Sequence, residues 1–255
     1  AMSRAQAAEL ALFTLVAALA AAALPLQAGY LGWSWDALNH HIYLGYVAES
    51  PRFDRDVIAA SYQSYQYPYL YWPVYRLSLL DGGGAAAGAL WAALQAGLLL
   101  PPVWLLSLRL LPQRTPAAWG VAERAAACAL AFMSAIVVGG LEMTSNDLLA
   151  AVPLLWAFAV MAAEPATDRR AAVAAALWGV SAAFKLSNAL FLPLLVLWWL
   201  ARRGVPSVRR GLAVAAGACL GFGLAYAPWG WQLWQLTGNP FYPFLKAYFG
   251  PVAGG

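Results

Sequence analysis

The chain has 255 residues, of which 63% are hydrophobic and only 10% are charged. Soluble domains carry about 25% charged residues, so this composition excludes an ordinary soluble domain and indicates a protein whose solvent is lipid. The formal net charge of +4 comes from basic residues scattered at the ends of apolar runs, a distribution typical of membrane topology signals and not of a nucleic-acid-binding surface, so no nucleic-acid partner is expected.

The apolar runs predict the membrane crossings. They are rich in Ala and Leu and lack the period-two alternation of a membrane barrel, so we expect an all-α bundle in which residues 1–255 form a single transmembrane domain. A crossing needs about 20 apolar residues. The first predicted span, 9–29, follows Arg4 and is interpreted as a signal anchor, although it also resembles a cleavable signal peptide. Further spans are expected at about 84–108, 125–138, 148–163 and 212–227.

Residues 171–200 form a longer apolar stretch that is interrupted by Lys185, Ser187 and Asn188. Arginine pairs flank it on both sides, so the positive-inside rule places both flanks in the cytoplasm. Two short helices that meet near 185–188 satisfy this parity, whereas one long tilted helix would violate it. The count is then seven crossings with a cytoplasmic N-terminus. This topology places outside the acidic residues Asp36, Glu49, Asp54, Asp56, Asp81, Glu142 and Asp147.

The segment 30–81 is predicted to be a long outer loop, periplasmic or interfacial. It is too rich in Tyr and Trp for a plain linker. Aromatic belts at the membrane interface explain many of these rings without any function. Taken together, they favour an amphipathic helix on the outer leaflet, suited to a lipid-borne or sugar ligand. Tyr65 and Tyr67 are the rings that we expect to bind substrate.

Asp36 directly follows the first span. If a helix begins here, Asp36, Asn39 and His40 share one face, because residues three and four apart are neighbours. A carboxylate beside a low-dielectric wall has a raised affinity for protons, which makes Asp36 a candidate general base. The alternative is a structural N-cap. His41 points about 100° away from His40 on a helix, so at most one of the two would join a site with Asp36.

The other outer loop and the interrupted stretch add three charged candidates. Glu142 and Asp147 could complete an acidic cluster, although a solvated loop with Asp147 capping the next helix is the plainer interpretation. Lys185 lies between apolar helices, where a lysine is costly unless it is paired or faces water. A phosphate or an outer carboxylate would be a natural partner, and snorkelling to the interface is the alternative.

Four segments, 36–43, 140–147, 183–189 and 238–244, resemble recurring segments of the bacterial GT-C superfamily of integral-membrane glycosyltransferases. An acidic residue just after the first span and a long outer first loop add to the resemblance, which covers most of the chain. It implies the seven-helix core of that superfamily in a bacterial inner membrane. The implied activity is transfer of a sugar from a polyprenyl-phosphate donor to an acceptor at the periplasmic face, with inversion.

The resemblance also implies roles for individual residues. Asp36 would deprotonate the acceptor hydroxyl, and Glu142 or Asp147 would assist, with Mg²⁺ or Mn²⁺ as an optional cofactor. The ligands of such a cation would come from Asp36, His40 and Asp147, and the substrate-binding residues would be His40, His41, Lys185, Asn188, Tyr65 and Tyr67. Membrane lipids and the lipid-linked donor are the expected partners, together with other membrane subunits under the second hypothesis. That hypothesis is a non-catalytic accessory or scaffold subunit, and the third is a lipid or small-solute transporter.

Overall fold

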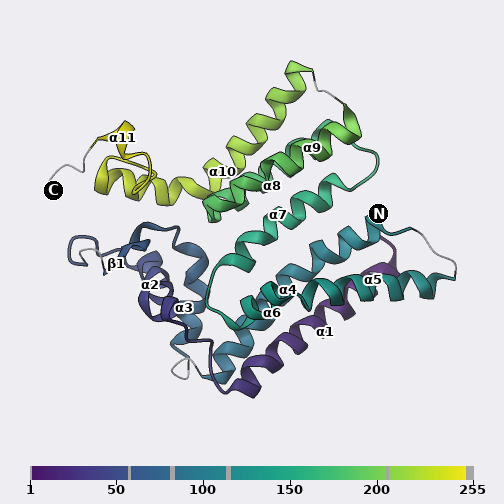
Figure 1. The fold of residues 1–255 in the computed structure, drawn as a ribbon, viewed down its shortest axis with the longest axis horizontal. Coiled ribbons are helices and arrows are strands. Elements are labelled where there is room, and N and C mark those ends of the chain that lie inside the picture. The colour runs from purple at the N-terminus through teal and green to yellow at the C-terminus, as the bar shows by residue number, and fades with distance from the viewer. Residues whose placement is uncertain (1, 57–58, 81–83, 113–115, 205–206, 251–255) are drawn as a thin grey trace.

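The computed structural model describes residues 2–56, 59–80, 84–112, 116–204 and 207–250, which form a bundle of helices with one short strand. Most of the long helices run along one direction, and a layer of short elements gathers at one end of the bundle (Figure 1). The helices of the bundle are α1 (Arg4–Ala28), α4 (Ala85–Leu110), α5 (Ala117–Phe132), α6 (Ala135–Glu142), α7 (Asp147–Met161), α8 (Asp168–Phe184), α9 (Leu192–Arg203) and α10 (Val208–Thr237). The short elements are η1 (Ala37–His41), α2 (Ile42–Glu49), β1 (Ala59–Tyr62), η2 (Gln63–Tyr65), η3 (Tyr69–Tyr71), α3 (Trp72–Ser78), η5 (Leu186–Phe191) and α11 (Lys246–Phe249).

The helices form two groups. In the first, α1 packs along α4, and α5 and α6 lie against them. In the second, α8 packs between α7 and α10. The contact between α4 and α7 joins the two groups. α5 and α6 meet at a bend of 63°, where the Ser134 side chain accepts a hydrogen bond from the Val137 amide and so caps α6.

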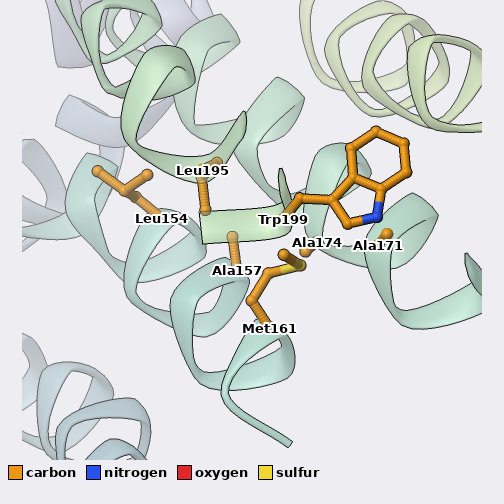
Figure 2. Packing of buried hydrophobic residues seen from close by; sticks show 7 residues of the cluster. All are labelled: Leu154, Ala157, Met161, Ala171, Ala174, Leu195 and Trp199. Carbon is orange, nitrogen blue, oxygen red and sulfur yellow. The ribbon is translucent and has the colours of Figure 1, made fainter. Parts of the chain in front are cut away.

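An apolar core fixes the second group. Leu154, Ala157 and Met161 lie on one face of α7, because residues three and four apart share a helix face. They pack against two alanines of α8 and against Leu195 and Trp199 of α9 (Figure 2). The small alanine side chains let α8 approach, while the Trp199 ring covers the space beside them.

The contact between α8 and α10 depends on glycine. Gly217 and Gly221 are four residues apart on α10, in the small-residue spacing that lets membrane helices pack closely. A Cβ atom added to Gly221 would lie 2.0 Å from the Ala176 carbonyl oxygen, and one added to Gly179 would lie 2.2 Å from the Ala218 carbonyl oxygen. The two backbones are therefore in direct contact, and no larger residue fits between them.

Among the residues that the structure describes, three helices, α1, α4 and α10, are long and apolar enough to cross a membrane, and the bent pair α5–α6 would make a fourth span if it is one crossing. Large apolar side chains of α1, among them Leu12 and Leu19, are exposed. These features indicate a membrane protein. α7 and the segment formed by η5 and α9 are apolar but shorter. The predicted count of seven crossings is not reached by length and composition, so it stays a prediction.

The predicted break at Lys185 is confirmed. α8 ends at Phe184, Lys185 is extended (φ −148°, ψ 109°), and η5 leads into α9, whose first turn contains a proline. Other boundaries were wrong. The predicted span 125–138 contains the bend between α5 and α6, and the last predicted span, 212–227, is the middle of α10, which continues through Pro228 to Thr237.

The predicted outer segment 30–81 contains several short elements, not one amphipathic helix. Its last residue, Asp81, lies outside the described residues. α2 packs closely on α3 and η3. Glycine at position 45 makes this approach possible, because a Cβ atom there would lie 2.3 Å from the Tyr75 Cβ. This layer covers the end of the bundle where α1 ends and α7 begins (Figure 1).

Candidate active site

A cavity of about 570 Å³ lies between this layer and the helix ends. Its walls come from segments that are far apart in the sequence: the turn after α1 with η1, the loop before α7, the end of α8, and the chain after α10. Its charged and imidazole side chains are Asp36, His40, His41, Asp147 and Lys185. Its larger aromatic residues are Tyr65, Tyr67, Tyr71, Phe184, Tyr226, Tyr242 and Phe244.

Glycine and serine bring Asp36 into the cavity. Gly29 ends α1 in the left-handed conformation (φ 82°). Gly32 then pairs with Met143, and a Cβ atom at Gly32 would lie 1.7 Å from the carbonyl oxygen of Glu142, the last residue of α6. The Ser34 hydroxyl accepts a hydrogen bond from the Ala37 amide. Asp36 occupies the N-cap position of η1, but among the described residues its carboxylate accepts no cap hydrogen bond. The side chain is 54% exposed and lines the cavity.

The two histidines are buried beside Asp36. His40 Nδ1 lies 3.8 Å from the Asp36 carboxylate. Burial lowers the pKa of His40, and the nearby carboxylate partly offsets this. His41 Nδ1 is 2.7 Å from the Thr144 hydroxyl, and its ring stacks on Tyr71 with centroids 4.9 Å apart. Burial is the main cause that lowers the pKa of His41 to about 4. The His41 imidazole is therefore neutral at pH 7.

Lys185 and Asp147 form an ion pair across the cavity floor. Asp147 is the first residue of α7, where a carboxylate is favourable because the N-terminal end of a helix carries partial positive charge. The ammonium and the carboxylate remain 38% and 52% exposed. The pair is thus accessible to a ligand, and Asp147 is the carboxylate partner that a lysine between apolar helices requires.

Two predicted site residues lie elsewhere. Glu142 is exposed at the end of α6 and lines a separate cavity of about 190 Å³ beside the end of α1. The Asn188 side chain donates hydrogen bonds to the Ala150 carbonyl (3.2 Å) and the Ser181 hydroxyl (2.9 Å). It therefore joins the break after α8 to α7. The structure does not bring either side chain into the cavity with Asp36.

The predicted tyrosines lie in the aromatic wall, where each also packs against other rings. The Tyr67 hydroxyl donates to the Ala225 carbonyl of α10 (3.2 Å), and burial raises the pKa of Tyr67 to about 12. Tyr65 stacks on Phe53 and meets Tyr242 edge to face, with centroids 5.5 and 4.7 Å apart. These rings shape the wall, and their faces toward the cavity are apolar surfaces on which a sugar can lie.

The chain after α10 supplies two wall residues, Tyr242 and Phe244, that were not among the predicted site residues. Asn239 is buried; its side-chain oxygen accepts a bond from the Phe241 amide (2.9 Å), and its side-chain nitrogen donates to the Phe244 carbonyl (2.6 Å). This turn directs Tyr242 and Phe244 to the cavity. The Lys246 ammonium lies 5.1 Å from the centre of the Tyr242 ring. The sequence already indicated this turn, because the Asn239-Pro240 pair in the 238–244 segment is typical of a turn.

The donor set for a metal is incomplete. Asp36 and His40 approach each other, but Asp147 pairs with Lys185. Among the residues that the structure describes, no group of three or more His, Cys, Asp or Glu side chains could hold a metal ion. The protein residues alone do not fit a divalent cation, so the Mg²⁺ or Mn²⁺ of the sequence analysis stays a prediction and enters no step below.

No family model, curated protein or solved structure matches this chain.

Proposed function

We propose that the chain is a membrane glycosyltransferase of GT-C type, which transfers a sugar from a polyprenyl-phosphate donor to an acceptor hydroxyl. The observation that carries the proposal is the cavity itself: one exposed carboxylate, Asp36, and one accessible ammonium, Lys185, line the same space between aromatic walls. A base for a hydroxyl proton and a cation for a phosphate are the two groups that this reaction needs.

In the proposed reaction the acceptor oxygen attacks the anomeric carbon while Asp36 accepts the hydroxyl proton. A bond forms between the acceptor oxygen and the anomeric carbon, and the bond from that carbon to the donor phosphate oxygen breaks. Polyprenyl phosphate leaves with the electron pair, and the configuration at the anomeric carbon inverts. Lys185 stabilises the charge on the leaving phosphate. Donor phosphate therefore replaces Asp147 as the partner of Lys185.

Charge distribution supports an outward-facing cavity. α4, α7 and α9 end, and α5, α8 and α10 begin, at the end of the bundle opposite the layer of short elements (Figure 1). Arginine pairs such as Arg169-Arg170 and Arg209-Arg210 lie in the first turns of α8 and α10. By the positive-inside rule that end is cytoplasmic. Seven passes and a bacterial inner membrane with the cavity at the periplasmic side form part of the proposal.

Cysteine accessibility tests this orientation. Leu38 beside the cavity and Trp119 in α5 are well exposed, at 73% and 64%. In a cysteine-free background, Leu38→Cys should react with an impermeant reagent from the periplasm and Trp119→Cys only from the cytoplasm. Reaction of both positions from one side would contradict the proposed topology.

A lipid-linked donor also needs a place for its tail. An almost wholly apolar groove of about 530 Å³ runs between α1, α4, α5 and α6. Leu24 and Leu141 line the groove next to the small cavity at Glu142. The small cavity in turn shares the lining residues Ser34 and Met143 with the cavity that contains Asp36 and Lys185. This series supports an isoprenoid chain in the groove with its phosphate near Lys185.

The proposal is tested with the purified chain in proteoliposomes and a panel of radiolabelled polyprenyl-phosphate sugars. We expect release of polyprenyl phosphate with at least one donor. Lys185→Met should raise the KM for that donor about 10- to 100-fold, the usual worth of a hydrogen bond to a charged group. Arg76→Met is the matched control, because Arg76 is an exposed cation of α3 that pairs with Glu49 outside the cavity. Equal effects of the two substitutions would contradict the role of Lys185.

An accessory or scaffold subunit is the second candidate. The observation that favours it is the exposed apolar surface of α10, which includes Leu224, Trp231 and Trp234. Under this hypothesis the chain would turn over no donor of the panel, and cross-linking from Trp231 would capture a protein partner in place of lipid.

A further inference from the structure

A second polar cavity lies at the end of the bundle opposite the candidate active site. It has a volume of about 550 Å³ and is lined by Arg109 from the last turn of α4 and by Arg169 and Arg170 from the first turn of α8. Its remaining walls include Val160 and Val173, which are apolar. Three guanidinium groups thus surround one apolar-floored cavity.

The nearby carboxylates do not neutralise these arginines. Within the described ranges, none of the three forms an ion pair, and three carboxylates at the same end are paired with other arginines. Those ion pairs are Glu9–Arg124, Glu164–Arg202 and Asp168–Arg210. The cavity therefore carries positive charge that calls for an anion from outside the chain.

Backbone contacts hold two of the guanidinium groups in place. Arg109 donates a hydrogen bond to the Ala159 carbonyl at the end of α7, and Arg170 donates one to the Pro165 carbonyl. A guanidinium has five N–H donors, so each group keeps donors for a further oxygen. The N-terminal end of α8, capped by the Thr167 hydroxyl, adds partial positive charge.

We propose that this cavity binds the phosphate headgroup of an anionic phospholipid. The ends of membrane-spanning helices lie at the bilayer surface, where headgroups are present at high local concentration. The arginines match phosphate oxygens, and the apolar floor matches the glycerol and first methylene groups. Basic pockets between helices are a known setting for anionic lipids. The proposal does not depend on the proposed glycosyltransferase activity.

The test uses the purified full-length chain in mild detergent and native mass spectrometry. Dioleoylphosphatidylglycerol is titrated against dioleoylphosphatidylcholine, which has the same tails and no net charge. We expect preferential binding of phosphatidylglycerol, and an Arg109→Gln/Arg170→Gln variant should bind it roughly 30-fold more weakly, at about fivefold for each charge removed. Arg209→Gln removes one charge at the same end from an exposed residue that does not line the cavity, and it should bind like the wild type.

Two results would overturn the proposal of an anionic lipid at this cavity. In one, the wild type binds the two lipids equally; in the other, the double variant and Arg209→Gln lose the same amount of phosphatidylglycerol binding. Displacement of the lipid by sn-glycerol 3-phosphate at the lipid's own concentration would instead identify a site for free phosphate compounds and overturn the assignment to a membrane lipid. An Arg109→Lys/Arg170→Lys variant, which keeps both charges, should retain most of the binding and separates a charge effect from a folding defect.

Discussion

Replacement of Gly221 by alanine is the sharpest test of how the cavity is supported. The new Cβ atom would lie 2.0 Å from the Ala176 carbonyl oxygen, a backbone atom that no side-chain rotation can move. The two helices must separate by at least about 1 Å to reach even 3.0 Å, a distance below which real Cβ atoms essentially never approach. Gly223 is the matched control, because a Cβ atom there has nothing within 4 Å.

The expected cost follows from this geometry. Overpacking a rigid contact costs about 1–3 kcal/mol, and a clash between backbones belongs at the upper end, about 3 kcal/mol. For a chain of this size that corresponds to a fall in Tm of roughly 6–12 °C. Gly223→Ala should be neutral or stabilise by up to about 1 kcal/mol, since alanine favours the helix.

The assay is thermal unfolding of both variants in the same detergent, followed by circular dichroism. Because Tyr226 follows Gly221 on α10 by less than two turns and lines the cavity, separation of α8 from α10 should also weaken donor binding. Equal Tm values for Gly221→Ala and Gly223→Ala would refute the close contact, and with it the placement of the aromatic wall.

Three further outcomes are expected. Arg124→Leu should cost about 3 kcal/mol, because it leaves the partly buried Glu9 carboxylate without its cation and with the Trp104 indole N–H as its remaining partner; Glu9→Leu/Arg124→Leu should recover most of the loss in a double-mutant cycle. Folding lowers the pKa of His41 from 6.5 to about 4, so between these pH values the unfolded chain binds more protons than the folded chain. The free energy of unfolding should therefore fall as the pH drops from 6.5 to 4. His41→Phe, which keeps a ring on Tyr71, should flatten this dependence when denaturation is measured at several pH values. Asn188→Ala should lower stability by about 1–3 kcal/mol and leave the KM for the donor unchanged, and a raised KM with normal stability would contradict its packing role.

Local chemistry explains what the sequence could predict. A lysine inside an apolar stretch is tolerated only where it finds a partner or water, so Lys185 marked the break between α8 and η5. Asp36 follows the end of α1 closely in the chain, so its carboxylate was expected near that end of the helix. The sequence predicted Asp36, Asp147 and the break at Lys185 at the outer ends of their spans, and in the structure all three residues line one cavity.

Tertiary contacts explain what the sequence could not predict. Glu142 ends α6 and Asp147 begins α7, on either side of one short loop. Within this loop Met143 pairs with Gly32, and Glu142 lines the small cavity whereas Asp147 lines the large one. Asn188 resembles a ligand-binding residue until its partners on α7 and α8 are known. The length of α10 was underestimated because proline is usually a helix breaker, whereas Pro228 lies inside this helix.

The most direct test of the proposed function is turnover of the lipid-linked sugar by Asp36→Asn. This change keeps the shape of the side chain and removes its ability to accept a proton, so kcat should fall by about two or more orders of magnitude while Tm stays within a few degrees. Asp54→Asn is the control, because Asp54 is an exposed carboxylate that pairs with Arg55 away from the cavity. If Asp36→Asn turned over the donor as fast as Asp54→Asn, Asp36 would not be the base and the proposed active site would be wrong.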